Sequence, residues 1–321
     1  MAVIFRHCLF SPLSRPLPLP GSSSSSSWPS RPQICFSSSS SASPHMDPHD
    51  EGRKKFKDFP YVSPPHRDLM VDLVSMVENR LDSQLLPCTL PPDVQYYQNE
   101  SGSASASLHI RSGHKPSKID FILGSWIHSE LPTGGALNIT SLSTYLSPWT
   151  DAPNFLLELI QSSPTLLVLI LDLPPRKDLV LYPDYLQTFY EDTQLDTRRQ
   201  VLEKIPGARS YISSSLYIRS LVSPTAITVR IETEASGPGR MEEVIKNNID
   251  PIAKEVLGIW LDQCVCVDRA VEETERADLE RRDGLVKSKT FEVDLGSSFP
   301  RLFGPEVANR VLGSIREYFI V

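Results

Sequence analysis

The sequence predicts an α+β fold: an α/β/α sandwich in which a central antiparallel sheet of about six strands is flanked by helices. Apolar segments follow one another in the middle of the chain, at residues 107–111, 119–128, 137–145, 154–161 and 166–173. The connections between them are too short for crossover helices, so neighbouring strands should be antiparallel. Segments with helical periodicity precede and follow these strands, which places helices on both faces of the sheet.

The helices are predicted from apolar residues that recur every three or four positions. The first covers residues 68–86 and is terminated by Pro87. A polar loop at 98–105 leads into the strands. The strands are followed by helices at 184–190 and 196–204, a further strand at 226–233, and helices at 241–248, 252–267 and 305–318.

Residues 1–46 differ in composition from the rest of the chain. They contain no Asp or Glu, three arginines and fifteen serines. This is typical of an organellar transit peptide, and prolines interrupt every candidate core of a secretory signal. We therefore expect residues 1–50 to be a plastid transit peptide with a disordered lead, and residues 51–321 to form one domain. A mitochondrial address and a low-complexity tail without any address are the alternatives.

Charge and motif content exclude several classes of function. The net charge is −7, and without the leader 29 basic and 39 acidic residues leave it near −10, which argues against general nucleic-acid binding. The longest apolar stretch, residues 166–173, is too short to span a membrane. The three cysteines after the leader lack C-x-x-C spacing, which argues against a disulfide framework and a zinc cluster. They are Cys88, Cys264 and Cys266. No G-x-G-x-x-G, P-loop, H-E-x-x-H or G-x-S-x-G motif occurs, so a nucleotide cradle, a zinc hydrolase and a nucleophile elbow are unsupported.

A series of short segments runs in order along nearly all of the chain after the leader. They are FPYVS (59–63), QLLPC (84–88), LPPDV (90–94), SLHIRSG (107–113), GSWIH (124–128), LNITS (137–141), APNF (152–155), ELIQSS (158–163), LVLILDLP (167–174), RKDLVL (176–181) and FPRLFG (299–304). Together they resemble one plant family, red chlorophyll catabolite reductase, which is related to the ferredoxin-dependent bilin reductases.

The resemblance implies a function that composition and spacing do not name. It implies reduction of one double bond in red chlorophyll catabolite, a linear tetrapyrrole, to primary fluorescent chlorophyll catabolite in the chloroplast stroma. It also implies that reduced ferredoxin is the electron donor and that the enzyme binds no flavin or metal cofactor. We expect other chlorophyll-breakdown enzymes as further partners, and a homodimer. The rival hypothesis is a non-catalytic carrier or scaffold that sequesters a phototoxic chlorophyll catabolite.

Without a cofactor, the bound pigment must accept single electrons while the protein supplies protons. Glu158 stands alone among apolar residues of a strand, where burial raises the pKa of a carboxyl toward the range of a general acid. The alternative is an edge-strand Glu that points to water. The resemblance implies that Glu158 and Asp294 are the two carboxyl groups of the pocket. A surface-loop or helix-capping residue is the alternative for Asp294. The charged stretch 272–283, followed by Gly284, indicates that Asp294 lies on a mobile segment that closes over the pigment.

Basic and aromatic residues are candidates for holding the pigment. Arg111 with His109, and Arg219, are the candidates for binding its carboxylate, because an arginine fork matches a carboxylate. A solvated arginine is the alternative for each. Trp126 is a candidate for stacking on a pyrrole ring, although a core position is the commoner case. The resemblance implies that Val222 lies where side-chain bulk influences the product epimer.

Ferredoxin is acidic, so an acidic enzyme needs a local basic patch to bind it. Arg176 and Lys177, beside two prolines at the end of a strand, are the residues expected there, and an ordinary solvated turn is the alternative.

Overall fold

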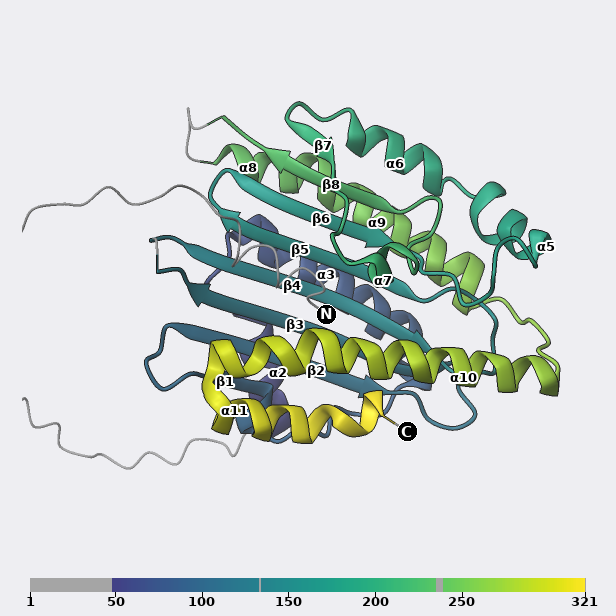
Figure 1. Ribbon diagram of the computed structural model, residues 1–321, viewed down its shortest axis with the longest axis horizontal. Helices are drawn as coiled ribbons and strands as arrows, with labels where there is room; N and C mark the ends of the chain where they lie inside the picture. Colours follow the sequence, from purple (N-terminus) through teal and green to yellow (C-terminus); the bar gives the residue numbers. More distant parts are fainter. Residues whose placement is uncertain (1–47, 133, 235–238, 321) are drawn as a thin grey trace, which may run out of the picture.

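The computed structural model describes residues 48–132, 134–234 and 239–320. Within this part of the chain, eight strands form one sheet in the order β1-β2-β3-β4-β5-β6-β8-β7, and every neighbouring pair is antiparallel (Figure 1). The strands are β1 (Tyr96–Gln98), β2 (Ala104–Ser112), β3 (Ile119–Glu130), β4 (Ala136–Leu146), β5 (Phe155–Ser163), β6 (Leu166–Asp172), β7 (Ala208–Ser210) and β8 (Ile227–Glu232).

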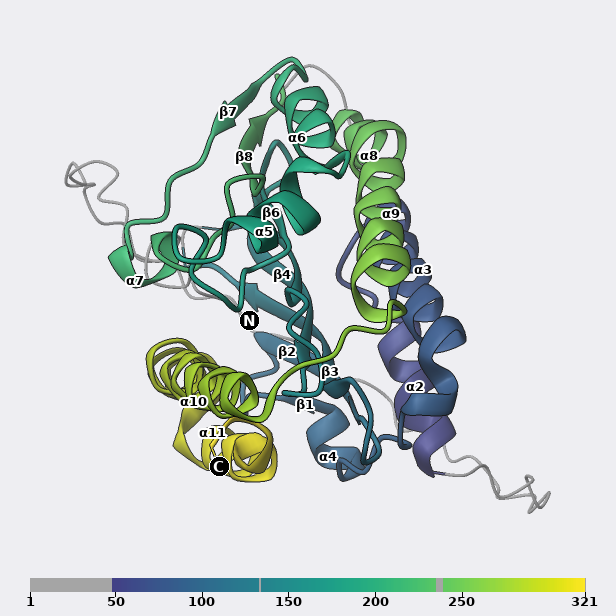
Figure 2. The ribbon, with the colours of Figure 1, turned by 90° about the vertical axis from the view of Figure 1, so that its right-hand side faces the viewer.

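Helices cover both faces of this sheet, which confirms the predicted α/β/α sandwich (Figure 2). One layer contains α2 (Pro48–Lys57), α3 (Pro64–Leu81), α8 (Arg240–Val244) and α9 (Asp250–Ile259). The other contains α7 (Leu216–Arg219), α10 (Glu273–Thr290) and α11 (Gly296–Phe319). The remaining helical elements are η1 (Asp82–Gln84), α4 (Pro92–Gln95), α5 (Pro183–Leu186), η2 (Gln187–Glu191), α6 (Leu195–Glu203), η3 (Ile245–Ile249), η4 (Trp260–Val265) and η5 (Phe291–Leu295). None of the described helices is long and apolar enough to cross a membrane.

Each face of the sheet has its own hydrophobic core, because side chains alternate along a strand. On β5, Phe155, Leu157 and Leu159 belong to the core beneath α3 and α9. Ile160 belongs to the core beneath α11. Glu158 faces the same side as Ile160, so its carboxyl lies toward the α7, α10 and α11 layer.

The structure differs from the sequence prediction in several places. The sheet has two additional three-residue strands, β1 and β7, which are too short to show an alternating pattern. Helix α2 occupies residues 48–57, where the sequence shows mainly a basic run. The charged stretch 272–283, for which no helix was predicted, lies almost entirely within the 18-residue helix α10. Acidic residues in its first turn and lysines in its last turn complement the helix dipole.

Candidate functional site

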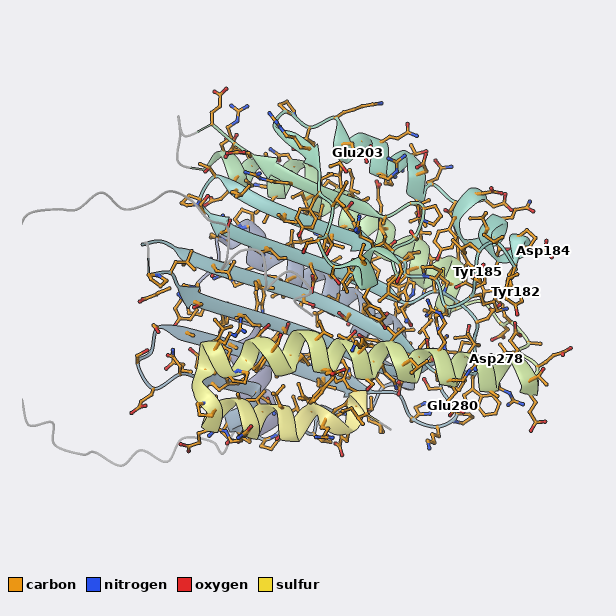
Figure 3. All side chains as sticks on the ribbon, viewed as in Figure 1. Tyr182, Asp184, Tyr185, Glu203, Asp278 and Glu280 are labelled. Atoms are coloured by element: carbon orange, nitrogen blue, oxygen red, sulfur yellow. The ribbon has the colours of Figure 1, made fainter. Side chains whose placement is uncertain are left out.

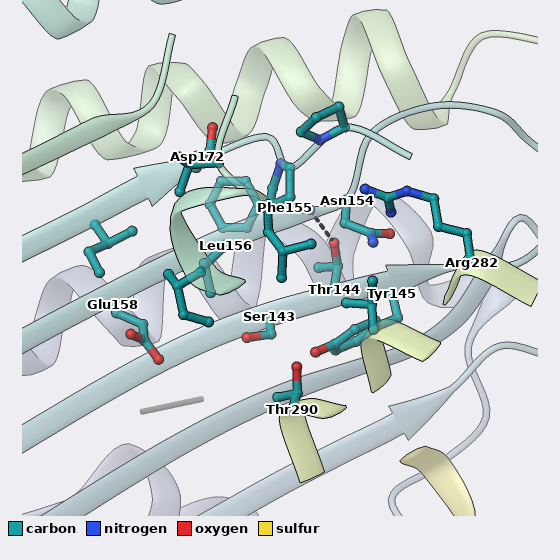
Figure 4. Close-up of a pocket in the computed structure, with 17 residues that line it drawn as sticks. Ser143, Thr144, Tyr145, Asn154, Phe155, Leu156, Glu158, Asp172, Arg282 and Thr290 are labelled. Carbon is teal, nitrogen blue, oxygen red and sulfur yellow. Dashed lines mark hydrogen bonds between the residues drawn. The ribbon is translucent and has the colours of Figure 1, made fainter. Parts of the chain in front are cut away.

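A central pocket lies between the sheet and two segments that cover it (Figure 4). The pocket floor is formed by side chains of three adjacent strands, Ser143 of β4, Leu156 and Glu158 of β5, and Ile170 and Asp172 of β6. The enclosed space is about 90 Å³. Small-molecule sites usually measure roughly 300–1,000 Å³. In this conformation the pocket is therefore too small for a large ligand.

Strand register explains why these side chains share one face. Glu158 pairs with Ser141 on one side and with Ile170 on the other. Two residues along the strands, Leu156 pairs with Ser143 and with Asp172. Positions directly opposite or two apart point to the same face of a sheet. The register thus brings two carboxyl groups onto one floor.

Two covering segments close the pocket. The roof segment, residues 216–223, contributes Ile218, Leu221 and Val222. Helix α10 contributes Arg282, Val286 and Thr290, which are spaced four residues apart and so lie on one side of the helix. Most of these side chains are apolar, so a ligand here would meet two floor carboxyl groups and one guanidinium in largely apolar surroundings.

The two floor carboxyl groups are buried. Glu158 is 1% exposed and Asp172 is 3% exposed. Burial raises the pKa of Asp172 to about 6, against the opposing effect of hydrogen bonds from Ser223 and the Leu173 backbone. The Ser223 hydroxyl donates to Asp172 Oδ1 at 2.5 Å, and the Ser223 amide donates to Asp172 Oδ2 at 3.0 Å. Carboxyl groups held away from water in this way are suited to general acid chemistry or to fixing a neighbouring segment.

Comparison with known proteins identifies the family. The profile described as "Red chlorophyll catabolite reductase (RCC reductase)" matches residues 65–317. "Red chlorophyll catabolite reductase, chloroplastic" of Arabidopsis thaliana is 52% identical over 325 residues, which cover 99% of this chain and 99% of that protein. "Red chlorophyll catabolite reductase 1, chloroplastic" of Oryza sativa subsp. japonica is 45% identical over 260 residues, covering 80% of this chain and 79% of that protein. The chain belongs to the red chlorophyll catabolite reductase family.

The fold is also found in a bilin reductase. A crystal structure of phytochromobilin synthase from tomato in complex with biliverdin superposes with a TM-score of 0.60, covering 79% of this chain and 84% of that chain at 15% identity. The two proteins therefore share a fold.

Three of the residues expected in the site of this family member lie at or beside the central pocket. Glu158 and Val222 line it, and the exposed Arg219 belongs to the same roof segment as Val222. Asp294 lies in η5, four residues after the pocket residue Thr290, and its side chain is outside the described part of the structure.

The other three expected residues face the opposite side of the sheet. Trp126 is fully buried and stacks on Phe59, with ring centroids 5.3 Å apart, so it belongs to the core under α2 and α3. His109 Nε2 lies 3.0 Å from Glu78 Oε1. Arg111 Nε donates to the Leu86 carbonyl at 2.9 Å. The structure therefore does not bring these residues together with Glu158.

His109 and Arg111 belong to a polar cluster around Glu78, which lies on α3. Hydrogen bonding and charge from His109, with further charge from Arg53 and Arg111, lower the pKa of Glu78 against the effect of its burial. Hydrogen bonds to Cys88 and Glu78 likewise raise the pKa of His109 despite its burial. These charges are compensated within the cluster, which joins α2 and α3 to strand β2.

Arg176 was expected to contribute to a basic surface patch for ferredoxin. That expectation was wrong, because the side chain is buried. Its guanidinium is hydrogen-bonded inside the protein. Nε donates to Asp283 Oδ2 at 2.9 Å, and Nη1 donates to the Thr150 carbonyl at 2.6 Å. Lys177 pairs with Asp151 at 2.8 Å and with Glu275. Figure 3 shows its neighbours Tyr182 and Tyr185 at the same end of the sheet as Asp278 of α10.

Two charged residues of the pocket, Asp172 and Arg282, were not predicted from the sequence. Asp172 carries the same signal as Glu158, a single carboxyl in an apolar strand (LVLILDLP). Arg282 lies in the charged stretch 272–283, for which no helix was predicted. Its spacing of four from Val286 and eight from Thr290 is the only signal that could have identified it.

A second hollow of about 770 Å³ lies on the other side of α10. It is lined by paired charges and aromatic contacts, such as Lys287 Nζ with Asp120 Oδ2 at 2.8 Å and Arg276 over the Trp149 ring at 4.5 Å. None of the seven expected site residues lines this second hollow. No group of three or more His, Cys, Asp or Glu residues in the described part of the chain could hold a metal ion.

Proposed function

We propose that this protein reduces one double bond of red chlorophyll catabolite, a linear tetrapyrrole, to primary fluorescent chlorophyll catabolite. The observation that carries this proposal is the buried Glu158 carboxyl on the floor of the central pocket, in a chain 52% identical to a red chlorophyll catabolite reductase over 99% of both sequences. Reduction of one double bond consumes two electrons and two protons. We propose that two molecules of reduced ferredoxin each deliver one electron directly to the bound pigment.

Glu158 is the proposed source of one proton, because it is the floor carboxyl that the family motif ELIQSS carries. Asp294 is the proposed second acid, since it follows Thr290 of the pocket by one helical turn along a continuous helical stretch. A general acid of this kind typically contributes about 10² to 10⁴ in rate.

Pigment binding requires the central pocket to open. A tetrapyrrole with four pyrrole rings cannot enter a cavity of about 90 Å³. The roof segment and α10 are the elements that must separate from the sheet to admit it. Closure over the pigment would then exclude water from the reduced intermediates.

Arg282 is the proposed partner for a pigment carboxylate, because its guanidinium lines the pocket and is about one-third exposed. Arg219 remains a second candidate at the outer end of the roof segment. Val222, as a small side chain in the roof, is proposed to influence which epimer forms at the new stereocentre.

We further propose that the protein acts in the chloroplast stroma after removal of a leader within residues 1–50, with mitochondria as the alternative address. The acid-free, serine-rich composition of the leader and the chloroplastic relatives support this. A homodimer, ferredoxin docking and association with other chlorophyll-breakdown enzymes belong to the same proposal. A reporter fused to residues 1–50 tests the address, and cytosolic fluorescence would contradict it.

The competing function is a carrier that binds the pigment without reducing it. A carrier of an apolar pigment gains nothing from a buried carboxyl on its floor, because desolvating a carboxyl costs free energy. The deciding experiment incubates purified protein with the red pigment and reduced ferredoxin under nitrogen. Appearance of the fluorescent product supports the enzyme, whereas binding without conversion supports the carrier. A parallel sample with NADPH alone should show no turnover.

A further inference from the structure

Asp172 and Ser223 connect the pocket floor to the end of its roof. Asp172 is the last residue of β6, and Ser223 follows Val222 at the end of the roof segment. Both residues are buried, with exposed fractions of 3% and 6%. The carboxylate accepts from the Ser223 hydroxyl at 2.5 Å and from the Ser223 amide at 3.0 Å, so each carboxylate oxygen holds one group of the same residue.

We propose that Asp172 is a positioning residue, which fixes the roof segment and thereby sets where Val222 meets the bound pigment. The expected effect on the product rests on the proposed function. The attachment of the roof by Asp172 does not depend on that function. Asp172 acts through Ser223, and both of its oxygens are already occupied by Ser223. The proposed task of Asp172 is therefore to hold the roof, whereas the proposed task of Glu158 is to donate a proton.

The contact is a two-point attachment of the roof. Hydrogen bonds to an ionised group are about twice as strong as those between neutral groups. Because the amide and the hydroxyl of Ser223 bind different oxygens, its backbone cannot rotate without breaking one of them. Ser223 Oγ also accepts from the Thr225 amide at 3.2 Å, which continues the attachment toward β8. Val222 is thus adjacent to a roof residue that is held at two points.

Part of helix α7, in the middle of the roof, is exposed to solvent. The first turn of α7 is capped by Ser215, whose hydroxyl accepts from the Ile218 amide at a long 3.4 Å. Leu216 is 73% exposed, and Arg219 and Ser220 are also exposed. This arrangement allows the middle of the roof to lift for pigment entry while its end at Val222 stays in place.

The cost of burying Asp172 supports a specific role. Burial raises its pKa to about 6, so the carboxyl is mainly ionised at neutral pH, inside an otherwise apolar strand. A leucine of similar shape would avoid this desolvation. The contact with Ser223 gives this buried acid a structural role that a leucine could not fill.

Three variants of the full chain test the proposal. Asp172→Leu keeps the shape of the side chain and removes both hydrogen bonds. Asp172→Asn keeps both contacts, because its amide oxygen accepts from the Ser223 amide and its NH₂ donates to Ser223 Oγ. Ser223→Ala removes one contact from the other side. Asp151→Asn is the matched control, since Asp151 is another buried aspartate that pairs outside the pocket, with Lys177 and Arg269.

Local opening is measured by the rate of tryptic cleavage after Arg219, which lies in the roof, with cleavage after the exposed Arg281 of α10 as internal reference. Loss of two hydrogen bonds to a charged group should speed cleavage after Arg219 by at least about tenfold in Asp172→Leu. Ser223→Ala should show a smaller increase. Asp172→Asn and Asp151→Asn should resemble the wild type, and cleavage after Arg281 should not change in any variant.

Turnover of the red pigment then reports on Val222. Asp172→Leu should raise KM more than it lowers kcat and should yield a mixture of epimers, whereas Asp172→Asn should restore the wild-type epimer ratio. Unchanged cleavage after Arg219 in Asp172→Leu would overturn the proposal. Loss of kcat in Asp172→Asn with an unaltered roof would also overturn it and make Asp172 a proton donor. If wild-type protein converts no pigment, the proposed function fails, while the cleavage rates still decide whether Asp172 fixes the roof.

Discussion

Glu158 and Asp172 are diagonal neighbours on one face of the sheet, because Glu158 pairs with Ile170 while Asp172 pairs with Leu156. Both carboxyl groups are buried, yet their surroundings differ. Asp172 is held by two groups of Ser223, whereas Glu158 lies nearer the middle of the strand among the floor residues of the pocket. The two acids can therefore have separate tasks in one cavity, proton supply for Glu158 and attachment of the roof for Asp172.

Arg282→Met and Arg111→Met should separate pigment binding from stability. Arg282 lines the pocket, so its loss should weaken pigment affinity by about tenfold, the effect of losing one charge-assisted contact, with little change in melting temperature. Arg111 binds Asp82 at 3.1 Å and the Leu86 carbonyl on the far face, so its loss should cost about 1–3 kcal/mol of stability. Fluorescence titration and thermal unfolding of both variants check this. Weakened pigment binding in a normally stable Arg111→Met protein would restore Arg111 to the site.

Strands β2 to β6 could be predicted from the sequence because they are rich in apolar residues and their connections are short. The face of the sheet on which each side chain lies could not be predicted, because it depends on the register between strands. Trp126 pairs with Thr140, which pairs with Leu159, so Trp126 and Leu159 lie on the same face. Glu158 precedes Leu159 on β5 and therefore lies on the opposite face. A shift of one residue would have exchanged the two faces.

Helix α10 could not be predicted for a different reason. Its buried residues are Leu279, Asp283, Lys287 and Thr290, which make a mainly polar row. Two of these are compensated by distant partners, Asp283 by Arg176 and Lys287 by Asp120. Periodicity searches look for an apolar stripe, so a helix fixed by buried ion pairs resembles a solvated charged segment.

The buried pair of Arg176 and Asp283 should be important for stability. Arg176→Met leaves the Asp283 carboxylate buried without its main cation, which should cost about 3–5 kcal/mol. The double variant Arg176→Met with Asp283→Leu should recover most of this loss, because no unpaired charge remains. Urea unfolding of the single and double variants measures the effect, and equal stability of the single variant and the wild type would show that α10 is held by other contacts.

Two buried groups should give opposite pH dependences of stability. The pKa of Asp172 is raised from 3.8 to about 6, so the folded state binds more protons and stability falls as pH rises from about 4 to 6. Burial lowers the pKa of His66 from 6.5 to about 4, so the folded state binds fewer protons and stability rises with pH over almost the same window. Each contribution is about 3 kcal/mol, and in the wild type they largely cancel.

Variants should expose the two contributions separately. Relative to wild type, Asp172→Leu should gain stability as pH rises from 4 to 6.5, and His66→Gln should lose it. His66→Gln keeps a partner for Thr140 Oγ1, which lies 2.8 Å from His66 Nε2. Urea midpoints at pH 4, 5, 6 and 7 test both signs. Parallel curves for the wild type and both variants would mean that neither group titrates differently in the folded and unfolded states.

The central claim is that Glu158 delivers a proton to a pigment bound in the central pocket, and Glu158→Gln tests it most directly. Glutamine preserves size and hydrogen-bonding capacity but cannot supply a proton. Pigment conversion with reduced ferredoxin under nitrogen should fall by about 10² to 10⁴, with pigment affinity and melting temperature near the wild-type values. Near-normal conversion by Glu158→Gln would contradict the account and leave the carrier, or a proton from solvent, as the better explanation.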